Sequence, residues 1–317
     1  MFLKIKMETC LEIKKLTKKL GKNKAISDLN LSISRGKKVA LLGLNGAGKS
    51  SFIRLLVGES QPDSGDIIYV DPETNDQNLR SQEIRFKKLL GYQADTMLSI
   101  TAMTGEEYLN LCGQLKGLSS KLMKGKLKKI SQQWQIENLL KLSMAELSKG
   151  NLQKLAIAQA FINDPKWLFF DEPCQSLDPL EQDRFNQNIK SLSEIELCVF
   201  STHNVEHALE MANDIVIFHQ CKIAYHFRSE NKQSYLVICK DVNSILPALA
   251  DELDIKIIEI TDKTFQLPSA NIDQIEKLKN RLDKAAIKLF LPEEQAVMPL
   301  FRLLASGEVS LNSNEHQ

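Results

Sequence analysis

Two stretches near the start of the chain alternate apolar and polar residues. Their apolar positions are Leu11 and Ile13 in the first stretch and Leu29, Leu31 and Ile33 in the second. A period of two is typical of antiparallel strands that pack one face on a core and leave the other face polar. The pattern therefore predicts antiparallel strands within residues 8–36, before a turn at Ser34-Arg35-Gly36 leads into the next strand.

Short, fully apolar runs further along the chain predict strands of a different kind. An apolar run of roughly 4–8 residues without alternation is typical of a strand buried on both faces of a parallel sheet. Such runs cover residues 39–42, 167–170, 197–200 and 215–218. We expect 215–218 to be the last strand of the first domain. Shorter strand patterns cover 66–70 and 89–92, and the polar residues 71–88 predict a surface arm.

Helical periodicity dominates residues 96–146. Thr104 and Glu107 form a capping-box pattern, which marks a helix start. Within the basic stretch 119–135, the lysines are Lys121, Lys124, Lys126, Lys128 and Lys129. The expected apolar stripe of that helix consists of Leu122, Leu127 and Ile130. The lysines then form a solvated face, although a basic run can also mark a phosphate or lipid surface.

The composition shifts near residue 229 and predicts a second, smaller domain at 232–317. Its patterns predict, in order, a strand at 235–239, a hairpin of 255–260 and 265–267, a helix at 272–284, a strand at 287–291 and a helix at 293–304. Strands and helices of this kind predict a small α+β extension.

Length, charge and cysteine content narrow the class of protein. The chain has 317 residues, enough for about two domains, and a net charge of +1, which argues against a dedicated nucleic-acid binder. Its six cysteines contain no C-x-x-C pair and fit reduced thiols in the cytosol. No apolar run reaches the roughly 18 residues of a membrane span, so another chain would have to cross any membrane. The start MFLKIK lacks an apolar signal-peptide core, and Met7 is an alternative start.

The stretch VALLGLNGAGKSSFIRLL, residues 39–56, contains the pattern G-x-x-x-x-G-K-S between a strand and a helix. This is a phosphate-binding loop, whose glycines let successive N–H groups point at an anion beside a helix N-terminus. A Gly-rich turn before an ordinary helix is disfavoured, because strand, loop, Lys-Ser and helix follow in the required order. The residues expected around the phosphates are Gly43, Asn45, Gly46, Ala47, Gly48, Lys49, Ser50 and Ser51. Lys49 can reach the β- and γ-phosphates, and Ser50 can ligate Mg²⁺.

Asp171 and Glu172 follow the apolar strand 167–170 and predict the second half of a nucleotide-hydrolysing site. The carboxyl ends of parallel strands are where ligands bind. Asp171 would hold Mg²⁺ through water, together with Ser50, and Glu172 would act as general base for the attacking water. Acidic residues are common at strand ends, but an acidic pair that follows a phosphate loop is specific.

With these motifs the chain resembles the ATP-binding cassette (ABC) ATPases over residues 8–228. The motifs are GLNGAGKS at 43–50, LSKGN at 147–151 in place of the usual LSGGQ, FFDEP at 169–173, SLDP at 176–179 and STH at 201–203. The resemblance implies an α/β core with a mixed sheet and helices, an antiparallel β subdomain and a helical subdomain at about 96–150. The α+β extension at 232–317 would follow this core.

The resemblance also implies a head-to-tail dimer, either a homodimer or a pair with a second ABC subunit, with two ATP molecules at its interface. Ser148 and Gly150 of one subunit would cover the ATP bound by its neighbour's phosphate loop. Asp178 would connect the two sites, and His203 would contact the γ-phosphate and position the water. A lone His after a strand is more often structural, and the Ser-Thr-His context reverses that interpretation.

Several positions depart from the family pattern. Lys149 and Asn151 replace the Gly and Gln of the common signature. Leu20 stands where an aromatic residue often stacks on adenine, so the expected contact with adenine is apolar. Asp95 occupies the place of the flexible-loop Gln and could ligate Mg²⁺ as a hard oxygen donor, while Gln93 lies two residues earlier.

The stretch SKGNLQ at 148–153, the short helical segment and the C-terminal extension resemble ATPase subunits of ABC-2 type exporters, whose permease is a separate chain. That resemblance implies a cytoplasmic protein held at the inner face of the cell membrane by its permease. The transported substrate would be selected by the permease. Two alternatives are a soluble ABC ATPase that acts on ribosomes or nucleic acid and a scaffold that binds ATP without hydrolysis. One phosphate loop, no sustained heptads and a balanced charge disfavour the nucleic-acid alternative.

Overall fold

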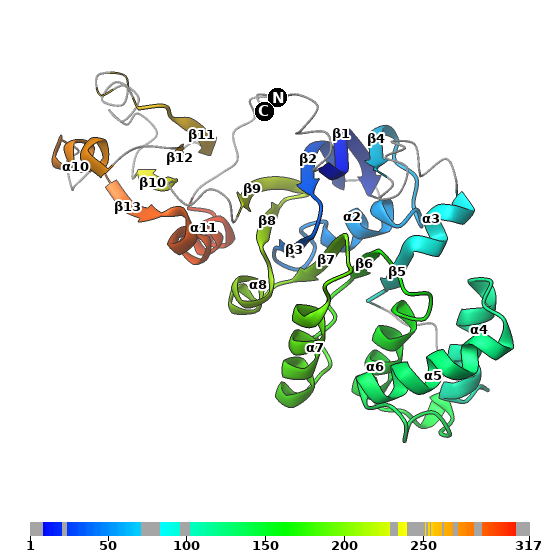
Figure 1. Cartoon of the computed structure of the whole chain (residues 1–317). Helices are drawn as coiled ribbons and strands as arrows, with labels where there is room; N and C mark the ends of the chain where they lie inside the picture. The colour runs from blue at the N-terminus through cyan, green and yellow to red at the C-terminus, as the bar shows by residue number, and fades with distance from the viewer. Residues whose placement is uncertain are drawn as a thin grey trace.

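The computed structural model contains three β-sheets with helices around them (Figure 1). It describes residues 9–20, 24–70, 83–95, 102–228, 234–239, 255–261, 263–268, 272–281 and 287–308, together with residues 251 and 253. None of the helices in these residues has the length and apolar character that a bilayer span requires.

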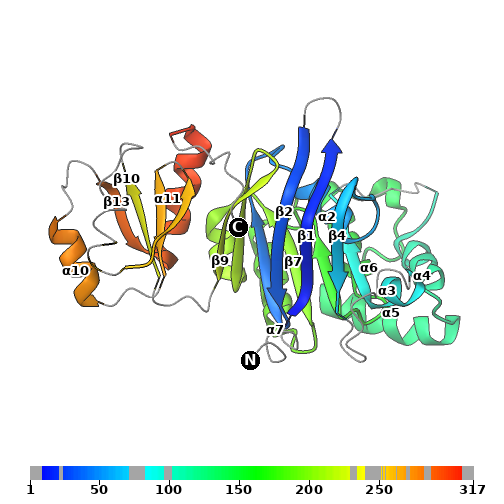
Figure 2. The same ribbon diagram turned by 90° about the horizontal axis from the view of Figure 1, so that it is seen from above.

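The alternating stretches form an antiparallel three-stranded sheet, as predicted. Its strands are β1 (Thr9–Leu20), β2 (Lys24–Ser34) and β4 (Ser64–Tyr69), in the order β2-β1-β4. Ile13 of the central strand pairs with Leu31 on one side and Ile67 on the other, and all three side chains are buried. Figure 2 shows these strands side by side.

The apolar runs form a six-stranded sheet in the order β5-β6-β7-β3-β8-β9. Its strands are β3 (Lys37–Leu42), β5 (Leu90–Gln93), β6 (Trp167–Phe170), β7 (Leu197–Thr202), β8 (Asp214–His219) and β9 (Lys222–Arg228). Every neighbouring pair is parallel except β8 and β9. The mixed sheet agrees with the predicted fold class.

The prediction that the strand at 215–218 ends the first domain was wrong, because β9 pairs with β8 as a hairpin. The hairpin turns at Gln220 and Cys221, whose φ angles are 48° and 62°. Turns with two positive φ angles usually carry Asn or Gly, and neither residue is present here. The turn therefore gave no signal in the sequence.

Alternate residues of the buried strands face two separate hydrophobic clusters. Val39 and Leu41 of β3 face the cluster that contains α2 (Lys49–Leu56) and the antiparallel sheet. Ala40 and Leu42 face the cluster that contains helices on the opposite side. Those helices are α4 (Gly105–Leu115), α5 (Ser120–Trp134), α6 (Lys149–Ala160), α7 (Pro179–Ser191) and α8 (Val205–Met211). Burial on both faces explains why the strands read as continuous apolar runs.

The helical region begins as predicted and differs in one detail of its packing. The Thr104–Glu107 capping box forms, and the 3₁₀ helix η2 (Met144–Glu146) precedes α6. Leu122 was expected in the apolar stripe of α5 but is 57% exposed, whereas Met123 is buried. Residues 71–82 of the predicted surface arm lie outside the described residues. Residues 83–88 of the arm belong to a short helix, α3 (Glu83–Leu89), whose Phe86 packs in the core.

The C-terminal elements form the third sheet, in the order β11-β12-β10-β13. They are β10 (Tyr235–Cys239), β11 (Ile258–Thr261), β12 (Thr264–Leu267), α10 (Ile272–Arg281), β13 (Ile287–Pro292) and α11 (Glu293–Ser306). The expected hairpin is present as the antiparallel pair β11–β12. Apolar residues of α11 join the same cluster as β9, so this part packs on the edge of the six-stranded sheet.

A substitution at Gly91 of β5 tests how closely α6 approaches the sheet. A Cβ atom at Gly91 would lie 2.2 Å from the carbonyl oxygen of Ala160, whereas a Cβ at Gly125 in α5 would meet nothing within 4 Å. Overpacking of this kind costs typically about 1–3 kcal/mol, so Gly91→Ala should lower the urea midpoint of unfolding. Gly125→Ala is the matched control and should raise the midpoint slightly, because Ala favours a helix interior. An unchanged midpoint for Gly91→Ala would contradict the close contact.

Candidate active site

The phosphate loop connects β3 to α2 at the carboxyl edge of the six-stranded sheet. Gly48 adopts φ 104° directly before the helix, where a side chain would be strained. A Cβ atom at Gly43 would lie 2.7 Å from the carbonyl oxygen of Phe218. The opposite side of the loop is held by Cys221, whose N–H donates to the carbonyl of Ala47 at 3.0 Å. The loop is thus held by close contacts at both ends.

Lys49 points back over the loop. Its side chain is 5% exposed, and its Nζ donates to the carbonyl oxygen of Gly43 at 2.7 Å. The same nitrogen forms an ion pair with Glu172 Oε1 at 3.2 Å. The structure therefore places a buried ammonium group between the phosphate loop and the predicted general base.

Asp171 is completely buried at the end of β6. Its Oδ1 accepts hydrogen bonds from Ser50 Oγ at 3.0 Å and from Ser201 Oγ at 2.7 Å. Oδ2 has no hydrogen-bond partner in the part of the chain that the structure describes. Burial raises the pKa of the Asp171 carboxyl above its ordinary value, and the two serine hydroxyls oppose that rise. A desolvated carboxylate with one free oxygen beside a serine hydroxyl is a donor set suited to Mg²⁺.

Glu172 follows with its carboxylate held between two basic side chains. Oε2 lies 3.1 Å from His203 Nδ1, and Oε1 faces Lys49. The backbone of Glu172 has φ 48°, a left-handed conformation that is costly for a residue with a side chain. Its N–H donates to Ser201 Oγ at 2.8 Å, which helps to hold that conformation.

The two positions considered for the flexible loop lie in different environments. Gln93 is buried at the end of β5, and its Nε2 donates to the carbonyl of Asp171 at 3.2 Å. Asp95 is exposed, yet its charge acts on Asp171 and contributes to the raised pKa of that carboxyl. Both residues therefore border the site. Leu20 ends β1, and its side chain lies outside the described residues.

Ser148, Gly150 and Asp178 lie at helix starts and make local contacts. Ser148 Oγ caps α6 by accepting from the N–H of Asn151 at 3.2 Å, and Asp178 Oδ1 caps α7 by accepting from Glu181 at 2.9 Å. A Cβ atom at Gly150 would lie 2.7 Å from the carbonyl oxygen of Ser176. Within the described chain, no hydrogen bond or ion pair joins these three residues to the phosphate loop. The structure thus brings the phosphate loop, Asp171, Glu172 and His203 together. It places Ser148, Gly150 and Asp178 away from them.

The remaining loop residues Asn45, Gly46, Ala47 and Ser51 lie in the turn and the first helical turn around Lys49, as the motif requires. The sequence motifs did not predict two residues that support the site. Ser201 binds both acidic residues, and Gln153 of α6 donates from Nε2 to the carbonyl of Pro173 at 2.9 Å. The Ser-Thr-His stretch contained a signal for Ser201, whereas a Gln inside a helix gives none.

Comparison with known proteins identifies the group to which this site belongs. A family model described as ABC transporter matches residues 26–175. The ABC transporter ATP-binding protein NatA of Bacillus subtilis is 29% identical over 231 residues, which are 70% of this chain and 92% of that protein. The Nod factor export ATP-binding protein I of Cupriavidus pinatubonensis is 30% identical over 246 residues, 77% of this chain and 73% of that protein.

Solved structures share the fold. The dimeric structure of MJ0796, a bacterial ABC transporter cassette, has a TM-score of 0.61 at 22% identity and covers 69% of this chain and 98% of that chain. The structure of an ATP-binding subunit of an ABC transporter has a TM-score of 0.59 at 25% identity and covers 86% of this chain and all of that chain. Together with the assembled phosphate loop and acidic pair, these similarities show that the chain belongs to the ABC transporter family as an ATP-binding subunit and is an ATPase.

Proposed function

We propose that this subunit powers a membrane exporter by binding ATP between two cassettes and hydrolysing it. The observation that carries the proposal is the convergence of Lys49, Ser50, Asp171, Glu172 and His203 at the ends of three neighbouring strands. Such a group can bind a triphosphate, neutralise its charge and activate water.

The magnesium ion of this reaction would bind at Ser50 and Asp171. The support is the buried Asp171 Oδ2, which has no partner among the described residues, and the Ser50 hydroxyl beside Oδ1. When bound, the ion would screen the negative charge of the β- and γ-phosphates. Asp95 is a further oxygen donor near Asp171 and could complete the site through water.

Glu172 would serve as general base once Lys49 leaves it. The ammonium of Lys49 lies 3.2 Å from Glu172 Oε1 and pairs with that carboxylate. A γ-phosphate competes for the same ammonium, since a phosphate carries more negative charge than a single carboxylate. Glu172 is then held by His203 alone at Oε2 and can take a proton from water.

The second half of each site would come from another cassette. The capped N-termini of α6 and α7 present Ser148, Gly150 and Asp178 without a hydrogen bond, among the described residues, to the phosphate loop of their own chain. Backbone N–H groups at a helix N-terminus bind anions well. A head-to-tail pair in which Ser148 and Gly150 reach the γ-phosphate of the neighbour would use these groups. The dimeric MJ0796 cassette supports such pairing through the shared fold.

A role in export is supported by the names of the relatives. One of them is an export ATP-binding protein, and NatA is an ATP-binding protein of an ABC transporter. We expect this subunit to act at the inner face of the cell membrane through a permease. The test is purification of the full chain from detergent-solubilised membranes, with identification of the membrane protein that accompanies it. Co-fractionation with ribosomes or DNA instead would contradict the proposal.

Glu172→Gln should retain ATP binding and lose turnover. Removal of a general base costs about 10²–10⁴-fold in rate. The measurement is steady-state ATP hydrolysis by the full chain, with nucleotide affinity measured separately. Glu206→Gln, an exposed change on α8, is the matched control and should hydrolyse ATP at the wild-type rate. Wild-type turnover in Glu172→Gln would remove this residue from the role of base.

Asp171→Asn should stabilise the nucleotide-free protein and abolish its Mg²⁺-dependent gain in ATP affinity. The raised pKa of Asp171 means that burial penalises the charged carboxylate, a penalty that the neutral amide of Asn avoids. The penalty is complete above the folded-state pKa and disappears as pH falls below the unfolded-state value. The melting temperature of the variant should therefore exceed that of the wild type at neutral pH, and the difference should shrink on acidification. A variant less stable at every pH would contradict this interpretation.

A further inference from the structure

Gln153 connects the signature helix to the backbone of the catalytic segment. It lies in the second turn of α6, the helix that Ser148 caps. Its Nε2 donates to the carbonyl of Pro173 at 2.9 Å and reaches the carbonyl of Glu172 at 3.5 Å. A side chain of α6 thus contacts the main chain at and directly after the predicted general base.

The segment that Gln153 holds depends on outside support. Glu172 adopts φ 48°, and a conformation of this kind persists only where the surroundings fix it. Ser201 Oγ accepts from the N–H of Glu172 at 2.8 Å, and Gln153 Nε2 donates to the carbonyl of the next residue, Pro173, at 2.9 Å. Gln182 of α7 supports the following residues through the carbonyls of Cys174 and Leu177. Of the three side chains that support this segment, Gln153 is the one that belongs to α6.

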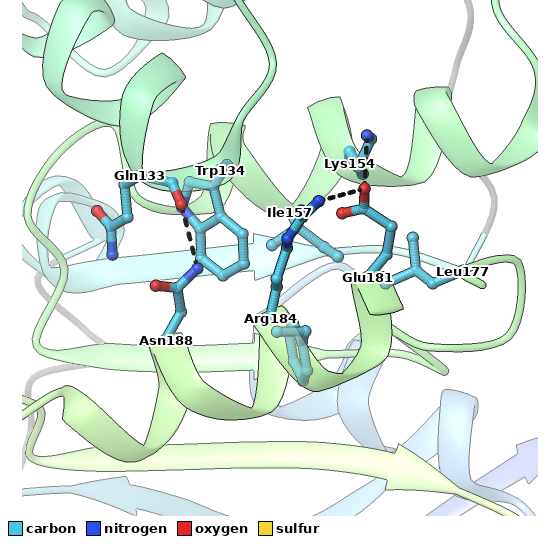
Figure 3. Close-up of a pocket in the computed structure, with 9 residues that line it drawn as sticks. Gln133, Trp134, Lys154, Ile157, Leu177, Glu181, Arg184 and Asn188 are labelled. Atoms are coloured by element: carbon cyan, nitrogen blue, oxygen red, sulfur yellow. Dashed lines mark hydrogen bonds and ion pairs between the residues drawn. The ribbon is translucent and has the colours of Figure 1, made fainter. Parts of the chain in front are cut away.

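α6 and α7 are joined to each other beside this contact. Figure 3 shows Lys154 of α6 and Arg184 of α7 on the same carboxylate of Glu181, at 3.2 and 2.9 Å. The side chains of Lys154 and Glu181 are 15% and 17% exposed, so this ion pair is largely shielded from solvent. A shift of α6 should therefore also move α7 and the loop before it. The Lys154–Glu181 ion pair joins α6 to α7, and Gly150 of α6 packs against the carbonyl of Ser176 in that loop.

We propose that Gln153 is a positioning residue that sets the backbone of Glu172 according to the position of the signature helix. The proposal rests on the function proposed above, in which Ser148 and Gly150 cover the neighbour's ATP. When that lid closes, α6 is fixed, and Gln153 holds the Pro173 and Glu172 carbonyls so that the carboxylate of Glu172 faces its own nucleotide. Closure of this subunit's lid over the neighbour's ATP thus affects the position of Glu172 at this subunit's own ATP. Gln153 does not touch the nucleotide.

Gln153→Met tests the proposal, because Met has a similar length and lacks the N–H donor. A misplacement of about 1 Å in a catalytic group can cost up to about 100-fold, so kcat for ATP should fall about 10- to 100-fold while KM changes less than about threefold. Gln132→Met, an exposed change on α5, is the matched control and should keep wild-type kinetics. The measurement uses the full chain, with the melting temperature of each variant recorded.

A second variant separates positioning from folding. In the Glu172→Gln background, ATP-driven dimer formation, followed by size-exclusion chromatography, should survive the addition of Gln153→Met, since Ser148 and Gly150 are unchanged. Loss of dimer formation, an equal change in kcat and KM, or wild-type kcat in Gln153→Met would each overturn the proposal. If the wild-type chain neither hydrolyses ATP nor dimerises with it, the proposed function fails instead, and the two failures are thereby distinguished.

Discussion

The burial of one carboxylate constrains this molecule more than any other interaction. Asp171 is removed from water at the end of β6, and burial of a charge is costly unless hydrogen bonds or a cation compensate. Ser50 in the first turn of α2 and Ser201 near the end of β7 supply part of the compensation. The register of β6 and β7 must therefore be kept, because a slip of one residue would turn Ser201 to the other face of the sheet.

The same sheet explains the division of the molecule into two hydrophobic clusters. Strands buried on both faces need a cover on each side, and the alternating residues of β3 show this directly. The antiparallel sheet and α2 cover one face, and the helical region covers the other. The phosphate loop lies at the edge between them. Its contacts come from the end of β6 and from the β8–β9 hairpin.

Sequence patterns predicted the parts of this structure that rest on local chemistry. The phosphate loop, the Thr104 cap and the parallel strands lie where periodicity and motif placed them. β9 was missed because its turn at Gln220 and Cys221 adopts positive φ without Gly or Asn. The partners of Asp171 and Glu172 that come from distant segments, such as Gln153, were also missed, because a hydrogen bond to a main-chain carbonyl leaves no trace in residue type. Leu122 was placed wrongly for a different reason: Met123, Leu127 and Ile130 have the i, i+4, i+7 spacing of a buried helix face, and Leu122 does not fit that spacing.

The packing of β9 has a consequence for where the chain can be divided. Tyr225 and Phe227 of β9 are buried in the cluster that also contains Leu300 and Leu304 of α11. A chain truncated after Arg228 would keep every motif needed for ATP chemistry and still uncover an aromatic flank beside an edge strand. Exposed apolar edges of this kind promote aggregation. A fragment that ends at Arg228 is therefore expected to self-associate more readily than one that retains α11.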